Sequence, residues 1–216
     1  MRKLLVLTIV LGLASWASAD VLWDQQPTGG NNYVDQEFGD FGDYSSYMVT
    51  DVDVDTGGWN ITSVTTYFTT GNGTWAQGMG GRLNIFDRTG ALPAAGDDPT
   101  AGLAVAVDVT VSGGMTVVTA SGLDIDVPAG AAWIGLAPSG DFAVYGQEFH
   151  LDAPLEGDAS AWRNPGNAFG NGTEWLNLPL VGYLYGDPSI TIEGTIIPEP
   201  ASLLLLGLGA LLIRRR

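Results

Sequence analysis

Three aspartates alternate with valine in the stretch DVDVDTGG, at Asp51, Asp53 and Asp55. Residues two apart in a strand point to the same side and lie about 6 to 7 Å apart. Neighbouring carboxylates could therefore share one calcium ion, which prefers oxygen ligands. The calcium-loop pattern of EF-hands fails, because Thr56 and Thr62 stand where it needs a glycine and an acid. The stretch predicts either a strand-borne calcium site or a solvated acidic face that discourages edge pairing.

A second candidate site is the stretch SAWRNPGNAFGNGTEW, which reads as a long loop. Trp162 and Trp175 could stack on sugar rings there, with Arg163 and Asn164 bonding to hydroxyl groups. Loops of this length are usually functional or disordered. The alternative is that both tryptophans cap the core, since tryptophan is highly buried on average.

Few residues in the sequence could form a catalytic site. His150 is the only histidine, there is no cysteine, and no Gly-x-Ser-x-Gly motif occurs. Glycoside hydrolysis needs two carboxylates that flank a sugar, and Glu148, Asp152 and Glu174 border the long loop. We expect a body that is not an enzyme and has no cofactor apart from the calcium ion considered above. A hydrolase of extracellular polymer is left as an alternative.

Short apolar runs must position these residues. They are rich in Val, Ile, Thr and aromatics and are separated by Gly, Asn, Asp and Pro, as strands are. Strands are expected at residues 21–24, 47–55, 60–69, 82–87, 103–111, 115–120, 123–127, 131–137, 147–151 and 189–196. The period of two predicts antiparallel pairing with one wet face per sheet. The expected fold is all-β, a single antiparallel β-sandwich of jelly-roll type.

Within this pattern, residues 103–111 are predicted as one strand with all five of its large aliphatic side chains on one face. Gly113 and Gly114 predict a hairpin turn. Residues 131–137 are predicted as a central strand, and residues 21–24 as an edge strand.

The N-terminus has the layout of a secretory signal peptide. Arg2 and Lys3 precede an apolar run at residues 4–13, and Ala17 and Ala19 form a small-residue cleavage site. We expect the export machinery and signal peptidase to act on residues 1–19, so that the mature chain begins at Asp20.

The C-terminus combines Pro198, Glu199 and Pro200, an uncharged run at residues 201–213, and a final group of three arginines, Arg214, Arg215 and Arg216. As a helix the run would extend about 20 Å, against about 30 Å of bilayer hydrocarbon. The arginines should stay cytoplasmic. The segment is predicted to be a transient inner-membrane anchor with an extended Pro-Glu-Pro at the membrane surface.

These two ends together resemble those of bacterial PEP-CTERM proteins. The resemblance implies processing by an exosortase near Pro198 and delivery to the cell surface or extracellular matrix. The stretches VPAGAAWIGLAP and SITIEGT are also similar to jelly-roll domains that often carry this tail. The expected organisation is a signal helix at 1–19, a β-sandwich at 20–197 and a sorting segment with a hydrophobic helix at 198–216.

The body is strongly acidic. Five of the eight basic residues and one of the 24 acidic residues lie in the two end segments, which leaves residues 20–197 with a net charge of −20. Such a charge repels nucleic acid and anionic membranes and attracts cations. We therefore expect an exported surface or matrix protein with no nucleic-acid partner; a carbohydrate-binding module that binds extracellular polysaccharide is the main alternative.

Overall fold

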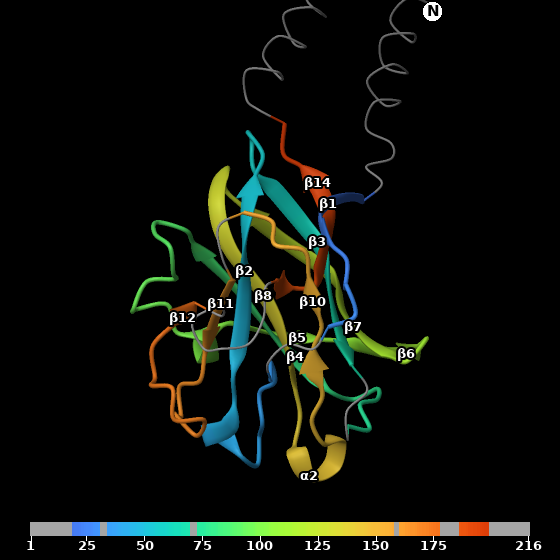
Figure 1. Cartoon of the computed structure of the whole chain (residues 1–216). Helices are drawn as coiled ribbons and strands as arrows, with labels where there is room; N and C mark the ends of the chain where they lie inside the picture. Colours follow the sequence, from blue (N-terminus) through green and yellow to red (C-terminus); the bar gives the residue numbers. More distant parts are fainter. Residues whose placement is uncertain (1–18, 31–33, 70–72, 158–159, 178–185, 199–216) are drawn as a thin grey trace, which may run out of the picture.

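The chain folds as a layered β-structure, seen in the computed structural model (Figure 1), which describes residues 19–30, 34–69, 73–157, 160–177 and 186–198. The strands are β1 (Asp20–Gln25), β2 (Tyr47–Val54), β3 (Trp59–Thr69), β4 (Gly80–Asp87), β5 (Leu103–Ala106), β6 (Asp108–Ser112), β7 (Met115–Val127), β8 (Gly130–Ser139), β9 (Phe149–His150), β10 (Asp152–Ala153), β11 (Ser160–Arg163), β12 (Leu176–Asn177), β13 (Asp187–Pro188) and β14 (Ile190–Ile196). Short helical turns are η1 (Gly42–Tyr44), η2 (Pro99–Ala101) and α2 (Phe142–Tyr145).

Two large sheets form the body. One has the order β1-β14-β3-β7-β6, with β9 also on β3, and the other has the order β12-β11-β2-β8-β4-β5. The pairings between these strands are antiparallel, which confirms the all-β antiparallel prediction. The central place of β8 and the edge place of β1 were also predicted. The predicted helices of the two end segments lie outside the described residues.

The main core lies between the two sheets. Val52, Ile134 and Leu136 from one sheet meet Ile61, Val64 and other side chains of the second sheet, and all five are buried. Full burial of such an aliphatic side chain stabilises a fold by about 1.5–3 kcal/mol. The period of two in β3 and β2 therefore has the packing role that the sequence predicts.

A second, smaller core covers the outer face of the sheet that contains β2 and β8. Its members are Tyr47, Val49, Trp133, Ala137, Ala161 and Trp175. The prediction of one wet face per sheet is wrong here, because side chains on both faces of β8 are buried. The near-continuous apolar run of β8 is the sequence pattern that such double burial requires.

The predicted strand at residues 103–111 is in fact two strands in different sheets. β5 pairs with β4 and β6 pairs with β7, and the chain crosses between the sheets at Val107. Val107 and Val109 are buried, whereas Leu103 and Val111 are exposed. The crossing divides a continuous alternating pattern, so the pattern alone does not reveal the change of sheet.

The predicted hairpin at Gly113 and Gly114 is present, with φ values of 62° and 83°. The two strands predicted after it form one long strand, β7, whose pairing with β3 shifts register between Ile61 and Ser63. Gly122, with a φ of 69°, lies beside this shift, where a positive φ is tolerated by glycine without strain.

The sandwich has two distinct ends. Asp20 of β1 pairs with Gly194 of β14, so both ends of the described body leave from one end of the sandwich, and α2 lies at the opposite end (Figure 1). Among the residues that the structure describes, no helix is long and apolar enough to span a membrane.

Candidate functional site

The three aspartates of the predicted calcium site do not converge. Asp51 is buried, and its carboxylate pairs with the Nη1 of Arg88 at 2.9 Å. Asp53 is exposed, and Asp55 accepts a hydrogen bond from the indole of Trp59 at 3.2 Å. The described residues contain no group of three or more His, Cys, Asp or Glu side chains that could hold a metal ion. The calcium prediction fails because the arginine and the indole take two of the three proposed ligands.

The two tryptophans of the predicted sugar site belong to the interior. Trp162 is 0% exposed and Trp175 is 4% exposed. Each indole N–H is satisfied inside the protein, by the carbonyl of Val34 at 3.1 Å and by that of Asp97 at 2.8 Å. The prediction that these rings present faces to a ligand is therefore wrong. Tryptophan has a large apolar surface to bury, and Trp175 packs in the outer core while Trp162 packs against Met48 and Leu176.

Arg163 and Asn164 hold the long loop in place. The guanidinium of Arg163 donates to the carbonyls of Thr173 at 2.7 Å and Asp97 at 2.8 Å. The buried amide of Asn164 donates to the carbonyls of Asp43 at 2.7 Å and Ser45 at 2.8 Å. Both side chains donate to backbone carbonyls of the protein itself, which gives them a structural role in holding the loop.

His150 forms a buried pair with a carboxylate that the sequence does not single out. Its Nδ1 lies 2.7 Å from an oxygen of Asp35, and its Nε2 lies 2.9 Å from the carbonyl oxygen of Ser189. A carbonyl only accepts, so Nε2 carries a proton. Burial raises the pKa of Asp35, against the opposing effect of His150. With no hydroxyl at Nε2, the pair lacks the nucleophile of a catalytic triad.

The carboxylates considered for glycoside hydrolysis have separate environments. Glu148 is buried, which raises its pKa. Asp152 accepts a hydrogen bond from Thr28 at 2.7 Å, and Glu174 is exposed in the long loop. No interaction joins these three side chains in the described part of the chain.

Exposed aromatic rings instead gather at the end of the sandwich that carries α2. We call this group the aromatic tip: Phe41, Tyr44, Phe142 and Phe169, with exposures of 50%, 48%, 38% and 37%. Phe41 and Phe142 lie edge to face with ring centroids 5.8 Å apart, and Tyr44 and Phe169 do the same at 5.7 Å. The two pairs are linked by η1, which follows Phe41 and ends at Tyr44. Exposed apolar groups that adjoin in this way mark interaction sites.

Polar side chains fix the segments that carry the tip. Asp40 accepts from the backbone N–H groups of Phe142 at 2.7 Å and Ala143 at 2.9 Å, which ties the start of α2 to the η1 segment. Asn164 ties η1 to the long loop, since its Oδ1 accepts from the N–H of Phe169 at 3.3 Å. Three segments far apart in the sequence thus present their rings together.

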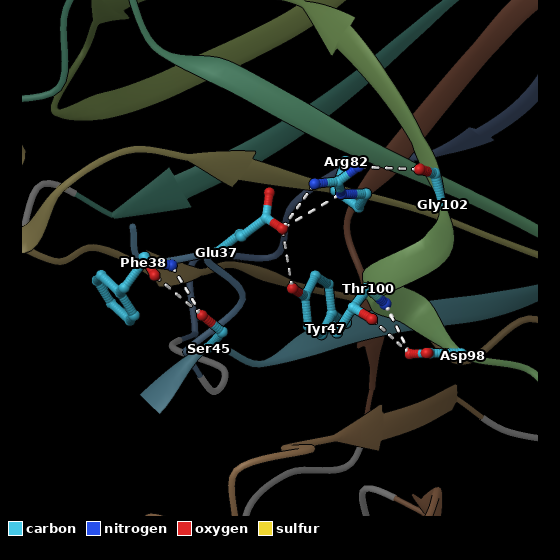
Figure 2. Close-up of polar contacts among 8 residues, drawn as sticks. All are labelled: Glu37, Phe38, Ser45, Tyr47, Arg82, Asp98, Thr100 and Gly102. Carbon is cyan, nitrogen blue, oxygen red and sulfur yellow. Dashed lines mark hydrogen bonds and ion pairs between the residues drawn. The ribbon is translucent and has the colours of Figure 1, made fainter. Parts of the chain in front are cut away.

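The base of the tip is anchored on the sheet, as Figure 2 shows. Glu37 accepts from Arg82 at 2.8 Å and from the hydroxyl of Tyr47 at 3.3 Å. Burial raises the pKa of Tyr47, and Glu37 adds to this effect, so the phenol stays a donor. The Ser45 hydroxyl accepts from the N–H of Phe38 at 2.9 Å and closes the segment that bears η1.

Carboxylates are the charged groups of this end. Asp43 and Asp141 are exposed beside the rings, in η1 and next to α2. The three arginines between residues 20 and 197 are engaged by the acceptors already described. The tip therefore combines aromatic surface with negative charge.

Of the four rings of the tip, only Phe169 lies in the long loop predicted as a sugar site, and none of the four is a residue predicted there. The missed rings stand in the stretches FGDFGDY and NAFGNG and next to Asp141, where a glycine or an aspartate adjoins each aromatic residue. Phe38 stands in the same glycine-rich stretch and is buried, so this pattern does not by itself distinguish the exposed rings.

The fold and its tip define a class: an antiparallel β-sandwich with an exposed aromatic surface at the end opposite the paired Asp20 and Gly194. Residues 197–216 match the family described as the PEP-CTERM protein-sorting motif, which confirms the predicted resemblance. The chain is thus a β-structured protein that carries a signal for sorting toward the cell surface or extracellular space. No curated protein and no solved structure matches it.

Proposed function

We propose that this is an exported surface or matrix protein whose body is a non-enzymatic binding domain for extracellular carbohydrate. Residues 1–19 direct export and are removed by signal peptidase. The sorting tail holds the chain in the inner membrane until an exosortase-type enzyme cleaves near Pro198. The sorting motif supports this route, and it is supported by the arrangement of the body, in which α2 lies at the end of the sandwich opposite the paired Asp20 and Gly194 (Figure 1).

The observation that carries the binding proposal is the exposure of the aromatic tip. The described residues include five aromatic side chains with more than a third of their surface exposed, and four of them form the tip. The fifth, Phe149, lies on β9. Leaving four such rings in water forgoes several kcal/mol of burial. A partner that covers them recovers this free energy.

A sugar ring has the chemistry that this surface requires. Its C–H face packs on an aromatic ring, while its hydroxyls donate to carboxylates such as those of Asp43 and Asp141. Negatively charged polymers are disfavoured because the body carries −20. The expected ligands are therefore neutral or amine-bearing polysaccharides rather than uronic-acid or sulfated ones.

Two experiments test the proposal. The intact mass of the protein recovered outside its native cell should lack residues 1–19 and the arginine-bearing end, and a product that keeps Arg216 refutes processing. A panel of insoluble cellulose, chitin, xylan and mannan should include at least one ligand, whereas alginate and heparin should not bind. Release of reducing sugar ends from the bound polymer would contradict a non-enzymatic body.

A further inference from the structure

A groove runs along one open side of the sandwich, separate from the aromatic tip. Two adjoining cavities form it, of about 430 Å³ and about 320 Å³, and both are lined by Ile85 and Phe86 of β4. These two residues point to opposite faces of the strand, since Ile85 packs on the main core and Phe86 on the outer one. The groove therefore follows the edge of β4 rather than either face of the sheet.

The edge of β4 has no strand partner beyond Leu83 because β5 is short, and the η2 segment with Gly102 forms the opposite border of the groove there. β8 pairs with all of β4, whereas β5 pairs only with residues 80–83. In the described structure, residues 84–87 make no backbone hydrogen bond on that side. The residues of an antiparallel strand alternate in the side to which their N–H and C=O groups point. Two of these four residues consequently offer unpaired backbone groups to the groove.

The other sheet also has an unpaired strand edge beside the groove, on β7. β6 covers only residues 115–119 of β7, so residues 120–127 pair with β3 alone. Ile125 of this stretch lines the larger cavity, together with Leu83 and Leu103. The crossing from β5 to β6 at Val107 closes one half of this side and leaves the other half open. The groove thus has an apolar floor between two unpaired strand edges.

The rim of the groove is acidic. Asp97 and Asp98 border the larger cavity, and Asp87 and Asp126 border the smaller one. Neither cavity is lined by a lysine or an arginine. A second copy of this chain, with −20 on its body, is repelled from this rim. A basic partner is attracted.

We propose that the groove accepts an extended basic segment of another protein, which adds a short strand along residues 84–87. Main-chain hydrogen bonds to a free strand edge supply affinity, and alternate apolar side chains enter the groove, as in other cases of strand addition. Lysine or arginine on both flanks of the segment meets the four carboxylates of the rim. This interaction is independent of the carbohydrate function, because it uses a different face and different residues.

The test uses the full chain in mild detergent and a capped synthetic peptide, Lys-Val-Thr-Ile-Thr-Val-Lys. Binding is followed by fluorescence anisotropy, and amide hydrogen exchange locates the contact. We expect saturable binding that weakens with salt, with new protection at residues 84–87. A peptide with proline at the centre and one with glutamate at both ends should not bind. Saturable binding without protection at residues 84–87, or no binding, overturns the proposal.

Matched variants distinguish binding in the groove from non-specific effects of net charge and exposed apolar surface. Asp87→Asn with Asp126→Asn should weaken binding by about two- to fivefold for each charge, while Asp53→Asn with Asp108→Asn, outside the groove, should not. Leu103→Ser should weaken it about tenfold, and Val111→Ser, at a similarly exposed site on β6, should have no effect. Equal losses in test and control variants overturn the proposal. So does concentration-dependent protection of residues 84–87 without peptide, which would assign the edge to a second copy.

Discussion

The rings of Trp162 and Phe169 lie edge to face with centroids 5.7 Å apart, although the first is fully buried and the second is exposed. This contact joins the interior of the sandwich to the aromatic tip. The core tryptophan contacts the loop from inside, and the loop phenylalanine stays exposed. Alanine substitutions at Trp162 and Phe169 should therefore have different effects on stability.

Trp162→Ala should destabilise the protein by about 3–5 kcal/mol, because it opens a cavity that the surrounding strands cannot fill. Phe169→Ala should cost less, about 1–2 kcal/mol, since 37% of its side chain is already exposed. Urea unfolding followed by circular dichroism gives both free energies. Equal costs for the two variants would mean that Phe169 is a core residue.

Arg88→Met should destabilise the fold by about 3 kcal/mol, because it leaves the carboxylate of Asp51 buried without this cation. Adding Asp51→Asn to this variant should restore part of the loss. The melting temperature of the wild type should be the same in calcium and in chelator, since Asp51 faces the arginine. A melting temperature that is higher in calcium than in chelator, with this difference lost in Asp53→Asn, would support the calcium site.

Asp187 gives the protein a specific pH dependence. Burial raises its pKa from 3.8 to about 6, with the charge of Asp51 adding to this, against hydrogen bonds from Glu156 N–H and Gln25. A raised pKa means that the folded state binds the proton more tightly. The stabilisation is therefore complete below about pH 4 and is lost as the pH rises through about 6.

Asp187→Asn keeps the shape of the neutral side chain and removes the titration. As the pH rises from 4 to 7, the free energy of unfolding of the variant minus that of the wild type should increase by up to about 3 kcal/mol. Denaturation curves at the two values measure this difference. A constant difference between the two proteins at both pH values would show that Asp187 does not titrate in this range.

His150 should resist diethyl pyrocarbonate in the folded protein. Both ring nitrogens are engaged, and the side chain is buried. Because it is the only histidine, the absorbance of the modified imidazole reports on it alone. Modification should appear only in urea. Rapid modification of the native protein would indicate an accessible imidazole and reopen a catalytic role.

Much of the fold could be predicted from the sequence, because alternation identifies strands wherever one face is buried. β2, β3, β8 and β14 were predicted within a few residues of their bounds. The change of sheet at Val107 could not be predicted, since an alternating strand looks the same whichever sheet receives it. The outer core was missed for a related reason: residues far away in the sequence cover Trp133 and Val49.

Residue type alone does not predict which aromatic side chains are exposed at the site. Trp162 and Trp175 were chosen because tryptophan is the best stacking residue, yet the same large surface makes it the most rewarding residue to bury. The buried pair of His150 and Asp35 could not be predicted either, because 115 positions separate the two residues. Only the three-dimensional arrangement shows which rings remain in water.

The central claim is that the aromatic tip binds carbohydrate, and its most direct test is an affinity comparison. The dissociation constant for the neutral polysaccharide found in the panel is measured for the wild type, for the triple variant Phe41→Ala, Phe142→Ala and Phe169→Ala, and for Phe149→Ala. Loss of three stacking rings should weaken binding by about tenfold to a thousandfold, and Phe149→Ala should stay within about twofold, because its ring lies outside the tip. Unchanged affinity in a folded triple variant, or an equal loss in Phe149→Ala, would contradict the claim.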